Sequence, residues 1–203
     1  MHPSKIIGIG VNYRLHAREM GNPIPAEPLM FLKPPSSVIG DGEAIQRPPG
    51  FEKVEYEGEL GVVIASRTRR IPRSRALEAV AGYTCVNDVT VRDLQQRDGQ
   101  WARAKGFDTF CPIGPRVVPG LDPTNLRIIT RLNGQVRQDA STSDMIFDVA
   151  TLVAFCSDHM TLEAGDVIST GTPWGVGNLT PGDVVEVEIE GIGTLRNPVT
   201  AVT

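Results

Sequence analysis

Glycine and proline interrupt this sequence at short intervals, which limits most helices or strands to a few residues. The 203-residue chain holds 21 glycines and 16 prolines, and they are spread along it instead of gathering in one linker. Such spacing is typical of folds that join many short strands by turns. Seven segments have strand-forming patterns, namely residues 5–10, 30–33, 52–65, 127–132, 166–170, 183–189 and 193–199.

Helices are predicted to be few and short. Residues 14–20 have room for two turns, and residues 75–80 follow a possible N-cap at Ser74. The clearest helix covers residues 148–157, with Asp148 as its N-cap and an apolar stripe at helical spacing. That stripe consists of Val149, Leu152, Val153 and Cys156. No boundary divides the chain, so we expect one β-rich α+β domain over residues 1–203, with a few helices at its edge.

Composition excludes several classes of partner. The net charge is −4 and aromatic residues make up 5% of the chain, so neither a basic surface nor stacking platforms for nucleic acid are expected. No apolar run approaches the length of a membrane span, and the first residues lack the apolar core of a signal peptide. We therefore expect a cytoplasmic protein that binds neither nucleic acid nor membranes. Its three cysteines lie among apolar residues and are predicted to be buried free thiols.

Acidic residues recur at alternate positions of one predicted strand. Glu55, Glu57 and Glu59 would share a face if the strand is regular, where their charges would repel each other. A divalent cation would relieve this repulsion, although a solvated edge strand carries similar patterns. Asp88 follows a buried strand pattern at residues 83–86 and is a further ligand candidate or a helix N-cap. A set of carboxylates favours Mg²⁺ or Mn²⁺ over Zn²⁺.

His16 and Glu19 are three residues apart, so a helix would place them on one face. A carboxylate beside an imidazole suits a general base, but an ordinary surface pair has the same spacing. The glycine-rich segment 171–177 lacks the residues of a nucleotide-binding loop, and it is predicted to be a tight turn that can approach a ligand.

Taken in order, these motifs resemble the fumarylacetoacetate hydrolase family along nearly the whole chain. The resemblance begins with Ile7-Gly-Ile-Gly-Val-Asn-Tyr13 before the His16 and Glu19 pair, and it continues through a series of short motifs. These are Phe31-Leu-Lys-Pro34, Tyr56-Glu-Gly-Glu-Leu60, Asn87-Asp-Val-Thr-Val-Arg-Asp93, Ala104-Lys-Gly-Phe-Asp108, Cys111-Pro-Ile-Gly-Pro115, Asn133-Gly134, Arg137-Gln138, Gly171-Thr-Pro173 and Gly175-Val-Gly177.

The resemblance implies a mixed β-sandwich or roll, usually a homodimer, that holds Mg²⁺ or Mn²⁺. The implied metal ligands are Glu57, Glu59 and Asp88. Lys105 and the His16–Glu19 dyad match catalytic positions. Gln138 and Thr172 match positions near the substrate. Because the chain begins close to its first motif, it resembles the compact members of the family: acylpyruvate and fumarylpyruvate hydrolases, oxaloacetate decarboxylases and homoprotocatechuate-pathway isomerases.

Reactions of the family start from a small 2-oxo acid bound through its carboxylate and 2-oxo oxygen, with negative charge developing at C3. Because the dyad is present, we expect hydrolysis of a 2,4-dioxo acid with release of pyruvate. Decarboxylation of oxaloacetate and isomerisation of a dienol diacid are the alternatives, and a non-catalytic ligand-binding module is a more remote one. A second substrate carboxylate would need a cation or amide, for which Arg14, Arg18, Arg92 and Gln138 are candidates that the sequence does not rank.

Overall fold

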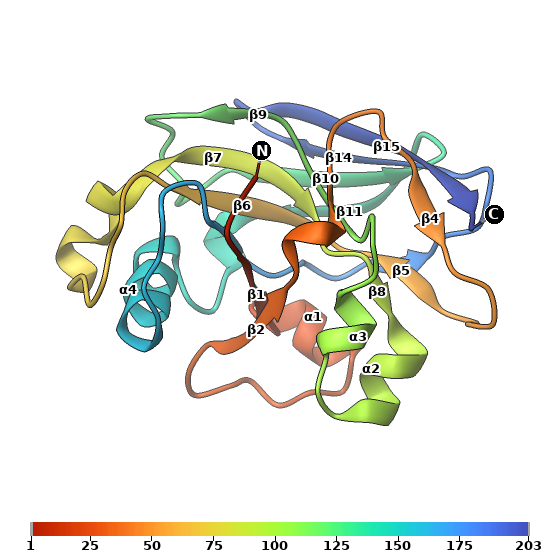
Figure 1. Cartoon of the computed structure of the whole chain (residues 1–203), viewed down its shortest axis with the longest axis horizontal. Helices are drawn as coiled ribbons and strands as arrows, with labels where there is room; N and C mark the ends of the chain where they lie inside the picture. Colours follow the sequence, from red (N-terminus) through yellow and green to blue (C-terminus); the bar gives the residue numbers. More distant parts are fainter. Residues whose placement is uncertain (1, 203) are drawn as a thin grey trace.

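Three sheets build the protein, as seen in a computed structural model that describes residues 2–202 (Figure 1). The largest sheet has seven strands, in the order β2 (Leu29–Lys33), β1 (Ile6–Gly10), β12 (Val167–Ser169), β6 (Gly58–Ile64), β7 (Val80–Asn87), β9 (Cys111–Val118) and β3 (Val38–Ile39). The second sheet has five, in the order β11 (Gln135–Ser141), β10 (Arg127–Leu132), β14 (Val184–Ile189), β15 (Gly193–Ala201) and β4 (Ile45–Arg47). The third joins β13 (Gly177–Asn178), β5 (Val54–Tyr56) and β8 (Thr90–Val91).

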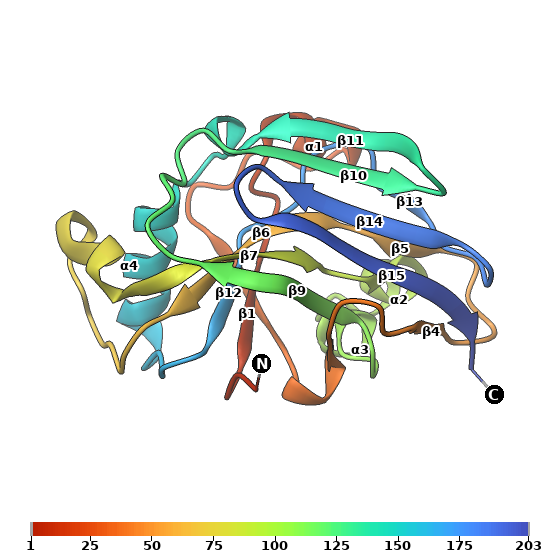
Figure 2. The same ribbon diagram turned by 90° about the horizontal axis from the view of Figure 1, so that it is seen from above.

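The two larger sheets lie over one another, with β10, β14 and β15 crossing above β6 and β7 (Figure 2). Their facing side chains form one apolar core. Leu60 and Val62 of β6 are buried in the same cluster as Ile128 of β10 and Val187 of β14. Most neighbouring strands are antiparallel, but the pairs β1–β12, β3–β9 and β4–β15 are parallel. The expected mixed, β-rich sandwich is therefore confirmed.

Four α-helices flank the sheets: α1 (Arg14–Glu19), α2 (Arg92–Asp98), α3 (Ala102–Lys105) and α4 (Val149–His159). Single 3₁₀ helices cover Pro35–Ser37, Arg73–Ala79 and Thr142–Asp144. Helix α4 confirms the prediction for its segment, because Asp148 accepts a hydrogen bond from the Thr151 amide and the apolar stripe is buried. In Figure 1, helices α1, α2 and α3 lie in the lower half of the molecule, and strands β10, β14 and β15 of the five-stranded sheet lie in the upper half.

Some local predictions were wrong or incomplete. Residues 75–80 belong to a 3₁₀ helix that follows Pro72, and Ser74 does not cap it; the Arg75 amide donates to the Pro72 carbonyl three residues back. The strand expected over residues 52–65 is divided at Glu57 into β5 and β6, which join different sheets.

Strand β9 was missed because Pro112, Gly114 and Pro115 interrupt its pattern. Pro112 is tolerated there because its neighbour is the two-residue strand β3 at the sheet edge. Strand β11 was missed as well: it is a mostly polar edge strand whose sequence carries no apolar alternation. The three cysteines are buried and free, as predicted. Within residues 2–202, no helix combines the length and apolar character needed to cross a membrane.

Candidate metal centre and active site

Three buried carboxylates meet where the seven-stranded sheet adjoins the small third sheet. Glu59 lies on β6, Glu57 lies between β5 and β6, and Asp88 follows β7. The pairing of Gly58 with Asn87 brings these segments together, and the Asp88 amide donates to the Glu57 carbonyl at 2.9 Å. Each side chain offers an oxygen atom within 4.8 Å of the others. The structure therefore assembles the three residues that the sequence indicates as metal ligands.

Two buried lysines compensate part of this negative charge. Lys105 Nζ lies 2.7 Å from Glu57 Oε2 and 2.6 Å from Asp88 Oδ2, so its ammonium bridges two of the three carboxylates. Lys33 Nζ lies 2.5 Å from the other Asp88 oxygen. The Lys105 ammonium thus lies between two of the three carboxylates that would hold a cation. Sequence reasoning missed Lys33, whose only signal is a lysine within the apolar strand β2.

The three carboxylates differ in how well the protein compensates them. Burial opposes ionisation of Glu57, but Lys105 and Arg92 outweigh it and hold the pKa of Glu57 well below its usual range. Burial raises the pKa of Glu59, and the charges of Asp88 and Glu57 raise it further. Of the three carboxylates, Glu59 is therefore the one whose negative charge the protein compensates least. An all-oxygen set of this kind fits a hard divalent cation.

Arg92 supports Glu57 from the first turn of α2. Its Nη2 lies 2.6 Å from Glu57 Oε1, its Nε lies 2.8 Å from Glu55 Oε2, and its Nη1 donates to Gln95 Oε1. Burial lowers the pKa of Arg92, but the negative charges of Glu57 and Glu55 outweigh burial and raise it. Glu55 stands apart from the three-carboxylate cluster, because the break in the strand at Glu57 turns β5 away from β6. The equal spacing of the three glutamates therefore does not give them equal roles.

The His16–Glu19 pair forms on α1 as its spacing predicts. His16 Nδ1 lies 2.9 Å from Glu19 Oε2, and the His16 side chain is 8% exposed while that of Glu19 is 32% exposed. Glu19 Oε1 accepts the Gly175 amide at 3.0 Å, so the glycine-rich loop holds the carboxylate in place. With Glu19 accepting at Nδ1, the imidazole can present Nε2 as a proton acceptor.

Gln138 and Thr172 are linked to each other but differ in their access to the site. Thr172 lines the cavity in front of Glu57 and Glu59, and its hydroxyl donates to the Gly58 carbonyl at 3.0 Å. Gln138 is fully buried and does not line this cavity; its Nε2 donates to Thr172 Oγ1 at 2.8 Å. Arg14 and Arg18 are exposed and line a separate depression beside Trp174. Of the candidates for substrate contact, Arg92 and Thr172 reach the cavity.

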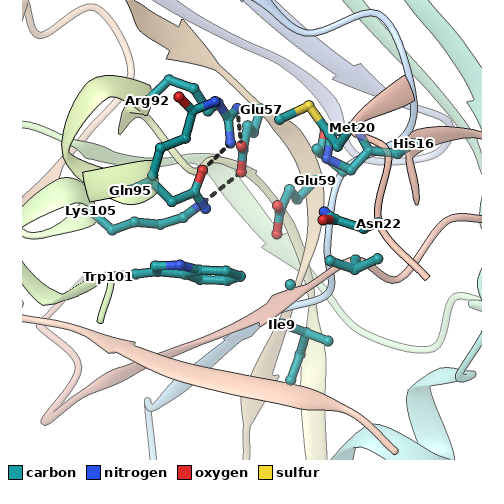
Figure 3. A pocket seen from close by; sticks show the side chains of 14 residues that line it. Ile9, His16, Met20, Asn22, Glu57, Glu59, Arg92, Gln95, Trp101 and Lys105 are labelled. Carbon is teal, nitrogen blue, oxygen red and sulfur yellow. Dashed lines mark hydrogen bonds and ion pairs between the residues drawn. The ribbon is translucent and has the colours of Figure 1, made fainter. Parts of the chain in front are cut away.

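The cavity has a volume of about 240 Å³, and it is lined by Glu57 and Glu59 of the carboxylate cluster and by His16 of the dyad. Figure 3 shows Lys105, Gln95 and Trp101 on one side of Glu59, with His16, Met20 and Asn22 on the other. Sequence reasoning missed Gln95, Trp101, Met20 and Asn22 as lining residues. Gln95 follows Arg92 at the i, i+3 spacing of one helix face, which is a usable signal. No pattern in the sequence points to Trp101, because it lies in the connection between α2 and α3.

Comparisons with known proteins point to one family. Residues 5–200 match the family model described as fumarylacetoacetate (FAA) hydrolase C-terminal. A protein of Archaeoglobus fulgidus is 57% identical over 195 residues, which span 96% of this chain and 78% of that protein.

Two solved structures have similar folds. The crystal structure of 5-carboxymethyl-2-hydroxymuconate delta-isomerase from Mycobacterium smegmatis is 49% identical, with a TM-score of 0.94, over 100% of this chain and 81% of the other. Fumarylacetoacetate hydrolase from Exiguobacterium antarcticum is 43% identical, with a TM-score of 0.91, over 99% of this chain and 76% of the other.

Proposed function

This chain belongs to the fumarylacetoacetate hydrolase family, and from that premise we propose that it is a hydrolase dependent on Mg²⁺ or Mn²⁺. The proposed reaction cleaves the C3–C4 bond of a 2,4-dioxo acid, such as an acylpyruvate or fumarylpyruvate, and releases pyruvate. One observation carries the proposal: a cluster of three buried carboxylates and a His–Glu pair adjoin the same cavity.

Glu57, Glu59 and Asp88 are the residues that would hold the cation. A bound Mg²⁺ or Mn²⁺ supplies Lewis acidity, which stabilises negative charge developing on the 2-oxo group. Lys105 adds an ammonium at the same place, because its Nζ already lies within hydrogen-bonding distance of Glu57 and Asp88. Arg92 orients Glu57 from the opposite oxygen. These residues lower the energy of an electron pair at C3, which is conjugated with the 2-oxo group.

His16 supplies the base that hydrolysis requires. It takes a proton from water, which adds to the C4 carbonyl, while Glu19 stabilises the imidazolium that forms. The C3–C4 bond then breaks, C4 leaves as a carboxylic acid, and C3 gains a proton to complete pyruvate. Thr172 positions the loop that meets Glu19, through its hydrogen bonds to Gly58 and Gln138.

A second candidate is favoured by the similarity to the Mycobacterium smegmatis delta-isomerase. Isomerisation of a dienol diacid, or decarboxylation of oxaloacetate, needs the same stabilisation of charge at C3 but no water attacking C4. The cation site and Lys105 would serve all three reactions. The dyad therefore separates hydrolysis from the other two.

Paired rates test this division. Exhaustive chelation is expected to abolish pyruvate release from an acylpyruvate, and Mg²⁺ or Mn²⁺ should restore it better than Zn²⁺ does. His16→Ala should lower hydrolysis about 10²–10⁴-fold, the usual contribution of a general base. Any oxaloacetate decarboxylation should fall far less, whereas Glu57→Gln should damage both reactions. Unchanged hydrolysis in His16→Ala would favour isomerase or decarboxylase activity over hydrolysis. Full activity after chelation would show that the reaction does not depend on a metal ion.

We also propose that the protein is a homodimer that binds neither nucleic acid nor membranes. Strand β2 is the last strand of its sheet, and its Leu29 and Leu32 are 43% and 47% exposed, so this edge presents apolar surface that a second copy would cover. Sedimentation velocity at micromolar concentration is expected to show a dimer, and a monomer would contradict the proposal.

A further inference from the structure

The positive charges that line the catalytic cavity are already paired with acidic side chains. Arg92 is 4% exposed, and each of its three guanidinium nitrogens donates to a protein oxygen. Lys105 is 2% exposed and bridges Glu57 and Asp88. Among the described residues that line this cavity, no other lysine or arginine is present. A metal ion bound by the carboxylates would free one of these two side chains from its ion pairs, and the side chain that is freed is the positive charge available to a substrate.

The partners of the two cations differ in one respect. Both partners of Lys105 belong to the three-carboxylate cluster, so a divalent cation there would compete for them and release the ammonium. Arg92 also pairs with Glu55, which lies on β5 outside the cluster and does not line the cavity. Glu55 would stay on Arg92 whether or not the cluster holds a cation. The Lys105 ammonium would thus be free to contact the 2-oxo acid head group, whereas the charge of Arg92 would still be neutralised by Glu55.

Apart from Glu57, Glu59 and His16, the rest of the cavity wall is uncharged. Apolar side chains from Ile9, Val11, Met20 and Trp101 alternate with amides from Asn22, Gln95 and Gln96. His16 is the remaining group that can carry positive charge, and Glu19 already compensates it. A second substrate carboxylate buried against such a wall would meet amides but no free cation, and a buried charge without a counter-charge is unfavourable. A neutral chain would instead gain from contact with the indole of Trp101.

We propose that the substrate carries a single carboxylate and a neutral distal acyl group that packs on Trp101 and Met20, and that Glu55 determines this specificity by neutralising Arg92. The inference rests on the proposed function and narrows it, because it favours neutral acylpyruvates over fumarylpyruvate, oxaloacetate and other diacids. Figure 3 shows Trp101 and Met20 on opposite sides of Glu59. The part of the substrate beyond C4 would lie between these two side chains.

Binding of two matched 2-oxo acids tests the proposal without turnover. 2-Oxohexanoate and 2-oxoadipate have the same number of carbons and differ at the far end, which is a methyl group in one and a carboxylate in the other. Calorimetry with the full chain and Mg²⁺ is expected to show at least about tenfold tighter binding of 2-oxohexanoate, which corresponds to about 1.4 kcal/mol. Equal or tighter binding of 2-oxoadipate would overturn the inference while leaving metal-dependent hydrolysis intact. Failure of both acids to bind, together with no cleavage of any acylpyruvate, would overturn the proposed function and this inference with it.

Glu55→Gln is the decisive variant, because it removes the charge that holds Arg92 and keeps the shape of the side chain. Its affinity for 2-oxoadipate is expected to rise about tenfold, while that for 2-oxohexanoate stays within about threefold. Parallel changes for both acids would overturn the role of Glu55.

Trp101→Ala keeps the inference testable should Glu55→Gln fail to fold. It is expected to weaken 2-oxohexanoate about tenfold and to change pyruvate, which lacks the distal chain, by less than threefold. Trp174→Ala, at the chain's other tryptophan, is the matched control because Trp174 lines a different depression. Equal losses for pyruvate and 2-oxohexanoate in Trp101→Ala would overturn the proposed packing.

Discussion

Two buried carboxylates on neighbouring parts of the same sheet, Asp166 and Glu59, have opposite electrostatic surroundings. Asp166 precedes β12 and is 0% exposed; Glu59 lies on β6, which pairs with β12, and is 1% exposed. Asp166 accepts the amides of Ser4, Lys5 and Glu163, the Ser4 hydroxyl and the Lys5 ammonium. Burial opposes its charge, but Lys5 and Ser4 outweigh burial and lower the pKa of Asp166.

Glu59 has fewer donors and no cation of its own. Its Oε2 accepts the Ser169 hydroxyl at 2.5 Å and the Gly171 amide at 2.8 Å, but Asp88 and Glu57 stand beside it and raise its pKa along with burial. The fold thus supplies a cation that neutralises Asp166, but it supplies no cation that forms an ion pair with Glu59 among the described residues. Burial alone does not separate a structural carboxylate from a candidate metal ligand; the balance of nearby charge does.

The largest expected effect of this difference is on metal binding. Glu59→Gln should weaken Mn²⁺ binding by at least about 100-fold, since even changes around metal ligands weaken binding by about 10–100-fold. Turnover that depends on added metal should fall with it. Asp166→Asn, the matched control, should bind Mn²⁺ within about threefold of the wild type. Titration of chelator-treated protein with Mn²⁺ measures both, and equal losses in the two variants would erase the distinction.

For the free energy of unfolding, the larger loss is expected in Asp166→Asn and not in Glu59→Gln. Asp166→Asn leaves several donors without their charged acceptor, so urea unfolding in the presence of chelator should show a loss of about 1–3 kcal/mol. Glu59→Gln removes a carboxyl group whose ionisation the folded protein disfavours, and it should leave the metal-free protein at least as stable as the wild type. A clear loss of stability in Glu59→Gln would mean that Glu59 supports the fold in its own right.

The smallest effect concerns the pH dependence of the free energy of unfolding. The contributions of the two carboxylates to it should change with pH in opposite directions. The folded pKa of Asp166 is lowered, so its contribution to the free energy of unfolding is present above the ordinary carboxyl range and is lost as pH falls through the folded pKa. The folded pKa of Glu59 is raised, so its relative contribution is present below the ordinary range and is lost as pH rises toward the folded pKa.

Unfolding of metal-free protein between about pH 2 and pH 8 checks these signs, since the lowered pKa of Asp166 lies below the ordinary carboxyl range. The deficit of Asp166→Asn relative to wild type should shrink on acidification through the folded pKa of Asp166. Any advantage of Glu59→Gln over wild type should also shrink as pH falls below the ordinary glutamate range, where wild-type Glu59 is protonated in both folded and unfolded chains. An advantage that grows on acidification would contradict the account of Glu59.

Local features were predictable where neighbours in sequence decide the structure. The bounds of β10 agree with the predicted segment 127–132, and the cap of α4 at Asp148 follows from one side chain and the next turn. The His16–Glu19 contact likewise depends on helical spacing alone. Where distant segments decide, prediction failed: β9 is a strand despite two prolines, because β7 and β3 supply its pairing.

By itself the sequence determined which side chains are available: the acids of residues 55–59, Asp88, the dyad and Lys105, together with motifs that indicate the family. Only the tertiary structure decided how they divide. The end of β5 at Tyr56 sends Glu55 to Arg92, while Glu57 and Glu59 join Asp88. It also brought Lys33 from β2 and Trp101 from the α2–α3 connection to the same place. The physical reason is that the charge state of a buried group depends on every charge within a few ångströms, and strand pairing between distant segments sets those distances.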